Sequence, residues 1–282
     1  MKVKKVINNN ILCAVDEKGE ELIITGKGIG YKRFPGEEID PKQIGKIYRM
    51  EGKEEQRKLR ELINEIPLEH FFLTQELVEY IKSQISNKLN ESLLITLADH
   101  ISFAIQRKEK GIEYKNPLSG PVMCYYPQEY QVGKVCLQMI EERCKIRLNP
   151  DEATFIALHI VNAEFNTKMS QMYDMTRMLD GCIRTAENYY QKKWNEDSVD
   201  LSRFVVHLRY MIWRLFKEKE QDNKKEEQDI LFRQIIQRNC ARHYQCALDI
   251  AAYIQNEYGK QIPEEELVYM TIHLKRLNME ED

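Results

Sequence analysis

The chain has 282 residues, 43% of them hydrophobic and 31% charged, which is enough for about two domains with cores of their own. Its formal net charge of −3 excludes a protein that is basic throughout, so any nucleic-acid site must rest on a local basic region. The seven cysteines form no CxxC pair, and no apolar run approaches the roughly 20 residues that span a bilayer. We therefore expect a cytoplasmic protein with reduced thiols and no membrane insertion.

The first 57 residues have the pattern of a small β-domain. Four strands are predicted from short runs rich in β-branched residues, at positions 3–8, 10–15, 20–27 and 46–50. Turns are expected at 16–20, where Gly19 can adopt positive φ, and at 34–40. A domain of this size has a marginal core, which pairing of two copies would remedy, so we expect a homodimer.

Two polar clusters in this region are candidates for binding RNA. The first 33 residues carry seven Lys and Arg against four Asp and Glu, an excess of +3. The run 8–10 consists of asparagines and fits either a polar turn or the reading of base edges, because an amide offers both a donor and an acceptor. The GKGIG segment at 26–30 ends a strand and opens no helix, so it matches neither nucleotide-binding fingerprint. Its glycines leave a flat surface beside Lys27 and Tyr31, which suits phosphates and stacked bases.

After Gly52 the pattern becomes helical, with apolar residues recurring at spacings of three and four. The stretch 53–66 is a charged helical start, and Asn149 with Pro150 predicts a capped helix N-terminus. A similar start is expected at Pro263. The charged run 217–229 predicts a solvated linker.

Two histidine-bearing segments of the chain recur in a second copy. In the first, a histidine precedes an arginine by seven residues, and in the second, a histidine follows a glutamate by seven residues. The equivalent pairs are His100 and His207, Arg107 and Arg214, His159 and His273, and Glu152 and Glu266. The copies lie roughly 110 residues apart, an ordinary domain length. We therefore expect three domains, at 1–57, 65–170 (the first module) and 171–282 (the second module).

The shared feature of the two copies is an imidazole among apolar residues, with an arginine one or two helical turns away. A neutral imidazole with an exposed nitrogen can accept a phosphoryl group, and a guanidinium group can hold the resulting phosphate. The repeated histidines are therefore candidate phosphoryl acceptors.

Metal chemistry is the main alternative interpretation of these segments. Asp99 beside His100 fits a metal-dependent phosphohydrolase, but the second copy has Val206 in place of the aspartate. A second metal candidate consists of Cys240, His243 and Cys246. At helical spacing these three spread over about 120° and cannot converge from one helix, so we expect no metal.

Taken together, these segments resemble the BglG/LicT/SacY family of transcriptional antiterminators. Residues 1–33 resemble the co-antiterminator RNA-binding domain, and the four histidine segments resemble two phosphotransferase regulation domains. The resemblance implies a multidomain chain, in which a small all-β antiparallel RNA-binding domain is followed by two all-α helical-bundle regulatory domains. It implies no cofactor and no catalysis beyond accepting phosphoryl groups.

The resemblance also implies partners. The N-terminal dimer would bind an antiterminator hairpin in the mRNA leader of a sugar operon, of the β-glucoside type. The matching positions on the RNA side are Lys5, Asn8, Asn10, Gly26, Lys27, Gly28 and Tyr31. The phosphorylation sites would be His100, His159, His207 and His273, with the histidine phosphocarrier protein and a sugar-specific enzyme II as donors. A DNA-binding activator with the same regulatory modules is an alternative, but the strand-like N-terminus is short for a helix-turn-helix plus a motor domain.

The two modules are expected to act in opposite directions. By resemblance, the first module inhibits when enzyme II phosphorylates it, and the second activates when the phosphocarrier does. Asp99 gives the first imidazole a carboxylate neighbour that Val206 does not give the second.

Overall fold

The computed structural model describes residues 1–17, 19–48, 57–58, 61–62, 65–217 and 230–279. The chain divides into two compact units, of which the first comprises 1–113 with 135–149 and the second comprises 114–134 with 150–282. The predicted linker from 218 onward, most of the charged helical start at 53–66, and the last two residues of the fourth predicted strand lie outside the described residues.

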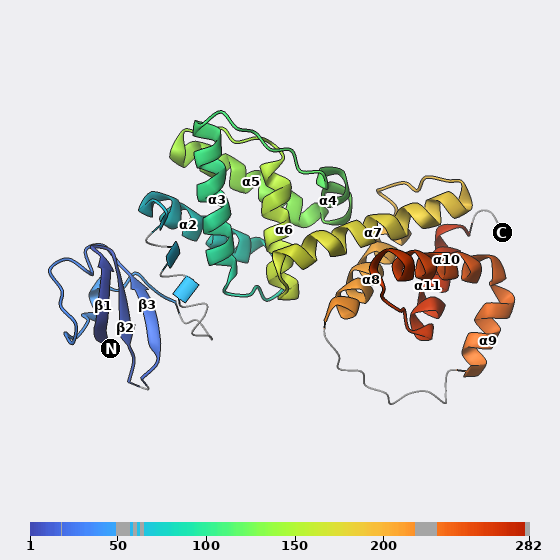
Figure 1. Cartoon of the computed structure of the whole chain (residues 1–282), viewed down its shortest axis with the longest axis horizontal. Coiled ribbons are helices and arrows are strands. Elements are labelled where there is room, and N and C mark those ends of the chain that lie inside the picture. The colour runs from blue at the N-terminus through green and yellow to red at the C-terminus, as the bar shows by residue number, and fades with distance from the viewer. Residues whose placement is uncertain (18, 49–56, 59–60, 63–64, 218–229, 280–282) are drawn as a thin grey trace. The chain divides into compact units, whose positions relative to one another are not determined.

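The N-terminal part of the first unit is one antiparallel sheet (Figure 1). Its strands follow chain order: β1 (Lys2–Asn8), β2 (Ile11–Val15), β3 (Glu21–Thr25) and β4 (Lys46–Tyr48). The register places Leu12 opposite Ile24 and Ala14 opposite Leu22, so alternate side chains of β2 and β3 reach the same small core. All four strands are confirmed, and Gly19 has the positive φ, +82°, that the turn before β3 requires.

The rest of the described chain is helical, as predicted. The helices are α2 (Leu68–Gln84), α3 (Leu93–Glu109), α4 (Ser119–Tyr125), α5 (Pro127–Cys144), α6 (Glu152–Phe165), α7 (Met169–Tyr190), α8 (Val199–Phe216), α9 (Ile230–Asn239), α10 (Ala241–Tyr258) and α11 (Glu264–Leu277). In the first unit α2 packs against α3, and a buried contact between His70 Nδ1 and Ser102 Oγ, 3.1 Å apart, joins them.

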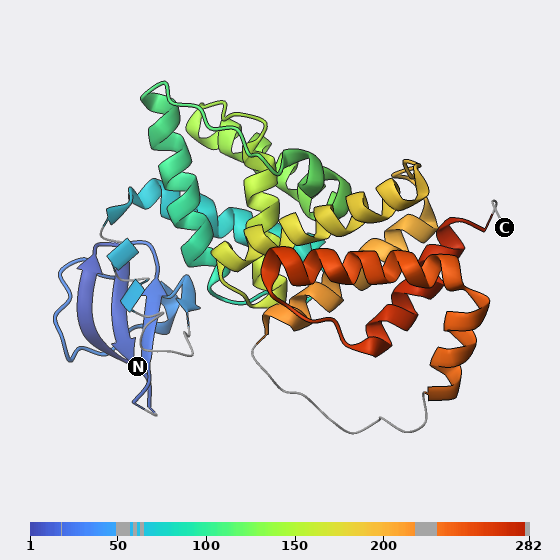
Figure 2. The ribbon, with the colours of Figure 1, turned by 45° about the vertical axis from the view of Figure 1, so that its right-hand side comes forward.

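Helix α7 is the centre of the second unit and packs against both α8 and α10 (Figures 1 and 2). Apolar residues at spacings of three and four bury one side of it, from Met172 to Tyr190. Gly181 lets α10 approach, because a Cβ there would lie 1.9 Å from the hydroxyl of Tyr253.

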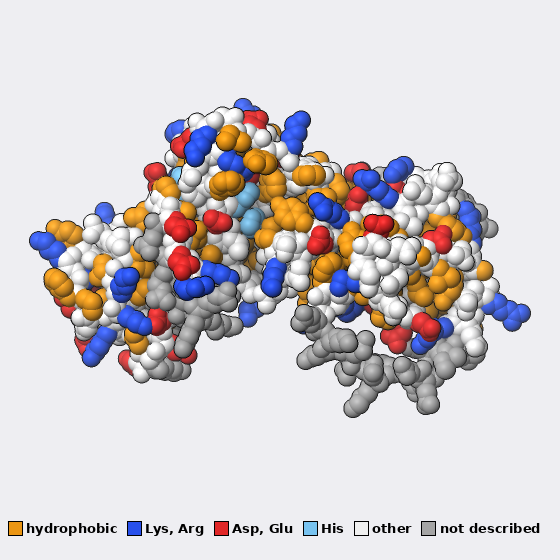
Figure 3. Space-filling model, viewed as in Figure 1, with side chains coloured by type: hydrophobic (Ala, Val, Ile, Leu, Met, Phe, Trp, Pro, Cys, Tyr) orange, Lys and Arg blue, Asp and Glu red, His pale blue; other side chains and the backbone are white. Residues whose placement is uncertain are grey.

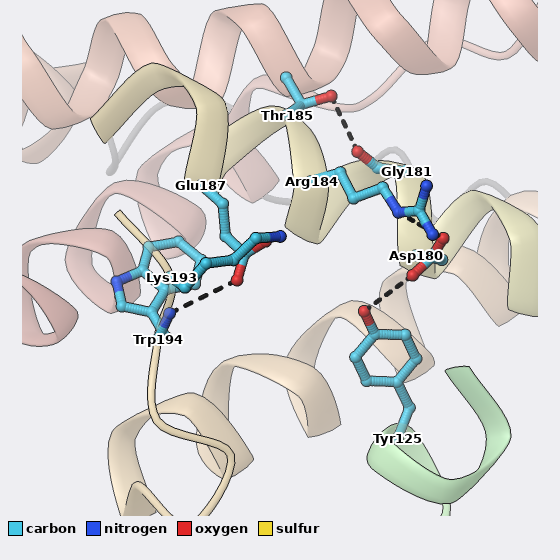
Figure 4. Close-up of polar contacts among 8 residues, drawn as sticks. All are labelled: Tyr125, Asp180, Gly181, Arg184, Thr185, Glu187, Lys193 and Trp194. Atoms are coloured by element: carbon cyan, nitrogen blue, oxygen red, sulfur yellow. Dashed lines mark hydrogen bonds and ion pairs between the residues drawn. The ribbon is translucent and has the colours of Figure 1, made fainter. Parts of the chain in front are cut away.

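Polar contacts attach neighbouring segments to the same helix (Figure 4). The hydroxyl of Tyr125 in α4 donates to Asp180 Oδ1 at 3.0 Å, and Arg184 pairs with the same carboxylate at 2.8 Å. Near the C-terminus of α7, Glu187 accepts from the backbone N–H of Trp194, which follows the helix, at 3.4 Å and also pairs with Lys193. These contacts fix α4 and the chain after α7, and they serve the scaffold.

One predicted helix start is wrong. Helix α6 begins at Glu152, with Asp151 as its N-cap residue, so Asn149 does not cap it. The N–H of Ala153 bonds to the carbonyl of Pro150 at 3.1 Å, which makes a turn of the expected first helical position. The carboxylate of Asp151 instead accepts from the backbone N–H of Asn116 at 3.0 Å. The second predicted start is confirmed, because α11 follows directly on Pro263.

Candidate functional sites: a polar sheet face and a histidine pair

The two polar clusters of the N-terminal region form one surface. The N–H of Gly26 donates to the carbonyl of Asn10 at 2.9 Å, and the N–H of Gly30 donates to the carbonyl of Asn9 at the same distance. The side chain of Asn10 adds a third link, because its Oδ1 accepts from the N–H of Gly28 at 2.8 Å. The β1–β2 turn therefore holds the glycine segment in place.

The glycines are required by this close approach. A Cβ on Gly26 would lie 2.0 Å from the carbonyl oxygen of Gln43, and one on Gly30 would lie 2.1 Å from that of Asn8. Gly28 has open space around it but a φ of +68°, which strains any residue with a side chain. Each glycine is thus fixed by sterics or by backbone conformation.

We call the seven predicted RNA-contacting residues the polar face. Its cations and its aromatic ring are exposed, with 59% of Tyr31 accessible, and Figure 3 shows basic side chains at the surface over the sheet. The Oδ1 of Asn8 accepts from the N–H of Asn10 at 2.9 Å. Both asparagines therefore use their oxygen within the protein, and their NH₂ groups are left to donate to a ligand.

The polar face continues into a hollow of about 420 Å³ in the first unit. Asn10, Gly26 and Lys27 line it from the sheet, and Phe72, Gln75 and Glu79 line it from α2. Lys46 Nζ pairs with Glu79 Oε1 at 2.7 Å at this place. An acidic side chain of the helical region is therefore paired with a cation next to the polar face.

The first-module histidines belong to different units. His100 lies half-buried in α3 of the first unit, and His159 lies in α6 of the second unit with 7% of its surface exposed. Asp99 is exposed and forms no hydrogen bond or ion pair with any described residue. Adjacent residues on a helix point about 100° apart, so the Asp99–His100 dipeptide does not place a carboxylate on the ring.

The second-module histidines are brought together. The rings of His207 in α8 and His273 in α11 are stacked, with centroids 4.9 Å apart and planes inclined by 21°. His207 Nε2 lies 3.0 Å from Glu266 Oε2, and Glu266 also forms an ion pair with Arg214. We call these four residues the histidine cluster. Two helices thus place a candidate acceptor pair, a carboxylate and a guanidinium in one group.

The surroundings set the protonation of this cluster. Burial, and secondly the charge of His207, lower the pKa of His273 to about 4, so its ring is neutral at pH 7. Burial alone would raise the pKa of Glu266, but the hydrogen bond from His207 and the charge of Arg214 outweigh it and lower the value. An ionised carboxylate only accepts, so Nε2 of His207 donates the hydrogen bond to it.

Sequence reasoning missed a second charged group in the second unit. Arg209 Nη2 lies 2.9 Å from Glu129 Oε1 and 3.6 Å from Glu164 Oε2, and its guanidinium carbon lies 4.5 Å from the ring centroid of Tyr126. All three charged side chains are largely buried, with 16% of Arg209 exposed. They come from α8, α5 and α6, so no local spacing signals them. Glu266 was detectable, because the repeat places Glu152 at the equivalent position.

The metal candidate from the sequence has another partner. His243 Nδ1 lies 2.8 Å from the hydroxyl of Tyr190 in a buried contact. Within the described ranges, no three His, Cys, Asp or Glu side chains are grouped so that they could hold a metal ion. Of the helices that the structure describes, none has the length and apolar composition that crossing a membrane requires.

Comparison with known proteins matches the whole length of the chain. The CAT RNA binding domain model matches residues 1–57, and the PRD domain model matches residues 75–163 and 180–277. Transcription antiterminator LicT of Bacillus subtilis (strain 168) is 36% identical over 277 residues, which cover 98% of this chain and 99% of that protein. The beta-glucoside operon antiterminator of Dickeya chrysanthemi is 30% identical over 280 residues, covering 99% of this chain and 98% of that protein. The crystal structure of GlcT CAT-PRDI aligns with a TM-score of 0.53 and 35% identity, over 58% of this chain and 97% of that one.

Proposed function

Because the chain belongs to the family of transcription antiterminators with a CAT RNA-binding domain and PRD domains, we propose that it binds an antiterminator hairpin in an mRNA leader. Binding stabilises that hairpin against an overlapping terminator, so that transcription continues into the operon. The observation that carries this proposal is the joining of the asparagine turn and the glycine segment into one polar face. The protein acts as a cytoplasmic homodimer and catalyses no reaction of its own.

The polar face supports a division of labour in RNA binding. The exposed Lys5 and Lys27 pair with phosphates, and Tyr31 offers its exposed ring for stacking on a base. The NH₂ groups of Asn8 and Asn10 donate to acceptors on base edges. Phosphate contacts position the protein, and the amide donors specify the sequence.

Phosphorylation of the four repeated histidines controls this binding. The donors are the histidine phosphocarrier protein and a sugar-specific enzyme II, and the operon serves a sugar of the β-glucoside type, as the name of the Dickeya relative suggests. Phosphorylation replaces a neutral imidazole by a group with up to about two negative charges. Two unit charges at the 4.9 Å spacing of His207 and His273 repel by about 3 kcal/mol at an effective dielectric of 20. Inverting a two-state equilibrium takes about 5.5 kcal/mol, so charge at one or two sites is sufficient.

Substitution of Asn10 in the full-length protein tests the RNA proposal. Asn10→Asp keeps an oxygen that accepts from Gly28 but removes the NH₂ donor. Its added charge repels all RNA, so the loss on the cognate hairpin should exceed the loss on a random hairpin by about 1–3 kcal/mol. Lys5→Ala should weaken cognate and random hairpins alike and reduce the log–log salt slope by roughly one. Gel-shift titration at several salt concentrations measures both. Equal losses on cognate and random hairpins for Asn10→Asp would refute base reading by this residue.

A read-through assay in a strain with an intact phosphotransferase system tests the histidines. If residues 65–170 inhibit, His100→Ala and His159→Ala should give read-through without sugar. If residues 171–282 activate, His207→Ala and His273→Ala should lower read-through with sugar present. His70→Gln, in a buried contact outside the repeat, is the control. Constitutive read-through from the second-module variants would reverse the assignment of the two modules. If all four variants responded to sugar like the wild type, the histidines would have no part in the mechanism.

A further inference from the structure

The histidine cluster contains a carboxylate at the place where a phosphoryl group would form. Glu266 approaches His207 Nε2 to 3.0 Å and pairs with Arg214 through its other oxygen, and only 13% of its side chain is exposed. A phosphoryl group on that nitrogen would need the same two neighbours: the ring to which it is bonded and a guanidinium that neutralises its charge. The carboxylate therefore has the charge sign and the partners of the product phosphate.

The two nitrogens of His207 differ in access. Nδ1 is buried and has no hydrogen-bond partner among the described residues, so a phosphoryl donor has no path to it. Nε2 lies 3.0 Å from Glu266, which in turn pairs with the half-exposed Arg214. The nitrogen that a donor can reach is thus the one that carries the proton and donates to Glu266.

His273 provides a contrast within the same cluster. It stacks on His207 at 4.9 Å, and no hydrogen bond joins it to any described residue. Its ring is neutral at pH 7, so one of its nitrogens has a free electron pair. The two candidate acceptors of the second module therefore differ: Nε2 of His207 is hydrogen-bonded to Glu266, whereas His273 has a nitrogen with a free electron pair.

The repeat supports a functional origin for this arrangement. Glu152 and Arg107 hold in the first module the sequence positions that Glu266 and Arg214 hold in the second. A carboxylate that served only packing in one module would have no reason to recur with the same histidine and arginine. The trio is thus part of the shared pattern of the two copies.

We propose that Glu266 masks the phosphoryl-accepting nitrogen of His207, and that Arg214 exchanges this carboxylate for the phosphoryl group when His207 is modified. The proposal rests on the proposed function, because it concerns the same phosphorylation. Glu266 is a positioning residue that sets the order of modification: His273 accepts first, and His207 accepts after the carboxylate has withdrawn.

The donor of the phosphoryl group in this step is a phosphohistidine. When Glu266 withdraws, the single ring proton of His207 moves to Nδ1, and Nε2 gains a free electron pair. That pair forms the new P–N bond, while the donor's P–N bond breaks and its electrons stay on the donor's ring nitrogen. Arg214 then pairs with the phosphoryl oxygens, and no oxidant or further reactant is needed.

Phosphoramidate labelling of the full-length protein tests the mask without any protein donor. This small reagent transfers its phosphoryl group to a histidine nitrogen and releases ammonia. Peptide mass spectrometry under neutral conditions gives the ratio of label at His207 to label at His273 in the same molecules. In the wild type we expect His273 to be labelled first. Glu266→Ala should raise the ratio about tenfold, the effect of removing one charge-assisted hydrogen bond.

Three variants separate masking from damage. Glu266→Gln keeps the shape but removes the charge, so it should raise the ratio by a smaller factor. Arg214→Ala should lower the label on His207, because the phosphoryl group loses its cation, whereas structural damage would move both variants in the same direction. Glu265→Ala is the matched control, because it removes an exposed carboxylate one position away and should leave the ratio at the wild-type value.

Two results would overturn the proposal. One is a labelling ratio in Glu266→Ala equal to that of the wild type. The other is a ³¹P signal from Nδ1-phosphorylated His207 in the labelled wild-type protein. The fate of the proposed function is read separately, from incubation with the phosphorylated phosphocarrier protein. If that donor labels no histidine while phosphoramidate shows the expected ratios, the proposed function fails and the mask stands.

Discussion

The polar face of the sheet is joined through its backbone, whereas the histidine cluster is joined through side chains. On the sheet, the N–H groups of Gly26 and Gly30 donate to the carbonyls of Asn10 and Asn9, and the carbonyl of Gln43 occupies the space beside Gly26. In the second module, the links from His207 to Glu266 and on to Arg214 run between side chains of two stable helices. A surface that must recognise a shape is thus built into the fold. The histidine cluster, the proposed site of phosphorylation, can change its side-chain contacts while its helices remain.

The largest test of this contrast is in the second unit. If the histidine cluster is dispensable for folding, other contacts must stabilise the second unit. We expect the ion pairs of Arg209 with its two buried glutamates to be among them. Arg209→Ala leaves two carboxylates buried without a cation and should cost about 3–5 kcal/mol, whereas His207→Ala should cost about 1 kcal/mol or less. Chemical denaturation measures both losses of stability, and hydrogen exchange of the α8 amides checks them locally.

The control for that test lies on the same helix. Arg203 pairs with Asp200 at 3.4 Å at an exposed position, so Arg203→Ala should cost about 0.5 kcal/mol or less. A loss for His207→Ala as large as that for Arg209→Ala would break the contrast, because the histidine cluster would then be part of the scaffold.

Glycine substitutions sharpen the other side of the comparison. Gly26→Ala places a Cβ against the carbonyl of Gln43, so the segment must shift, at a cost of about 2 kcal/mol and with loss of RNA binding. Gly28→Asn meets no steric obstacle, and asparagine tolerates positive φ, so it should cost less than about 1 kcal/mol. Exchange rates of the β2 and β3 amides, with a gel shift on the same preparations, test this. If Gly26→Ala bound RNA like the wild type, recognition would not depend on the backbone.

The smallest expected effect concerns pH. The folded protein lowers the pKa of His273 from 6.5 to about 4, so folding favours the neutral ring. This contribution to stability is complete above pH 6.5 and is lost as the pH falls toward 4, because the unfolded chain takes up the proton first. After solvent screening we expect a loss of about 1 kcal/mol over this window. Thermal denaturation of the wild type and His273→Gln should show a flatter curve for the variant, and parallel curves would contradict it.

The sequence was most informative where function depends on local pattern. The alternation of β-branched residues predicted the four strands, and the spacing of the repeat predicted which histidines are equivalent. The pairing of Asn10 with Gly28 was out of reach, because it joins a turn to a loop 18 positions away. The contact of Arg209 with Glu129 joins α8 to α5 across 80 positions, so only tertiary structure reveals it. Asn149 misled because a good capping residue was followed by a turn that used Pro150 and Asp151 differently.

The positions of the two sites along the chain have a consequence for synthesis. Every element of the sheet lies before residue 49, so the polar face is complete as soon as that part has left the ribosome. His207 meets Glu266 and His273 only when α11, the last helix, has been made. At about 5–20 residues per second, the remaining chain takes on the order of ten to fifty seconds to follow. A nascent chain therefore carries its polar face for that interval before its histidine cluster is assembled.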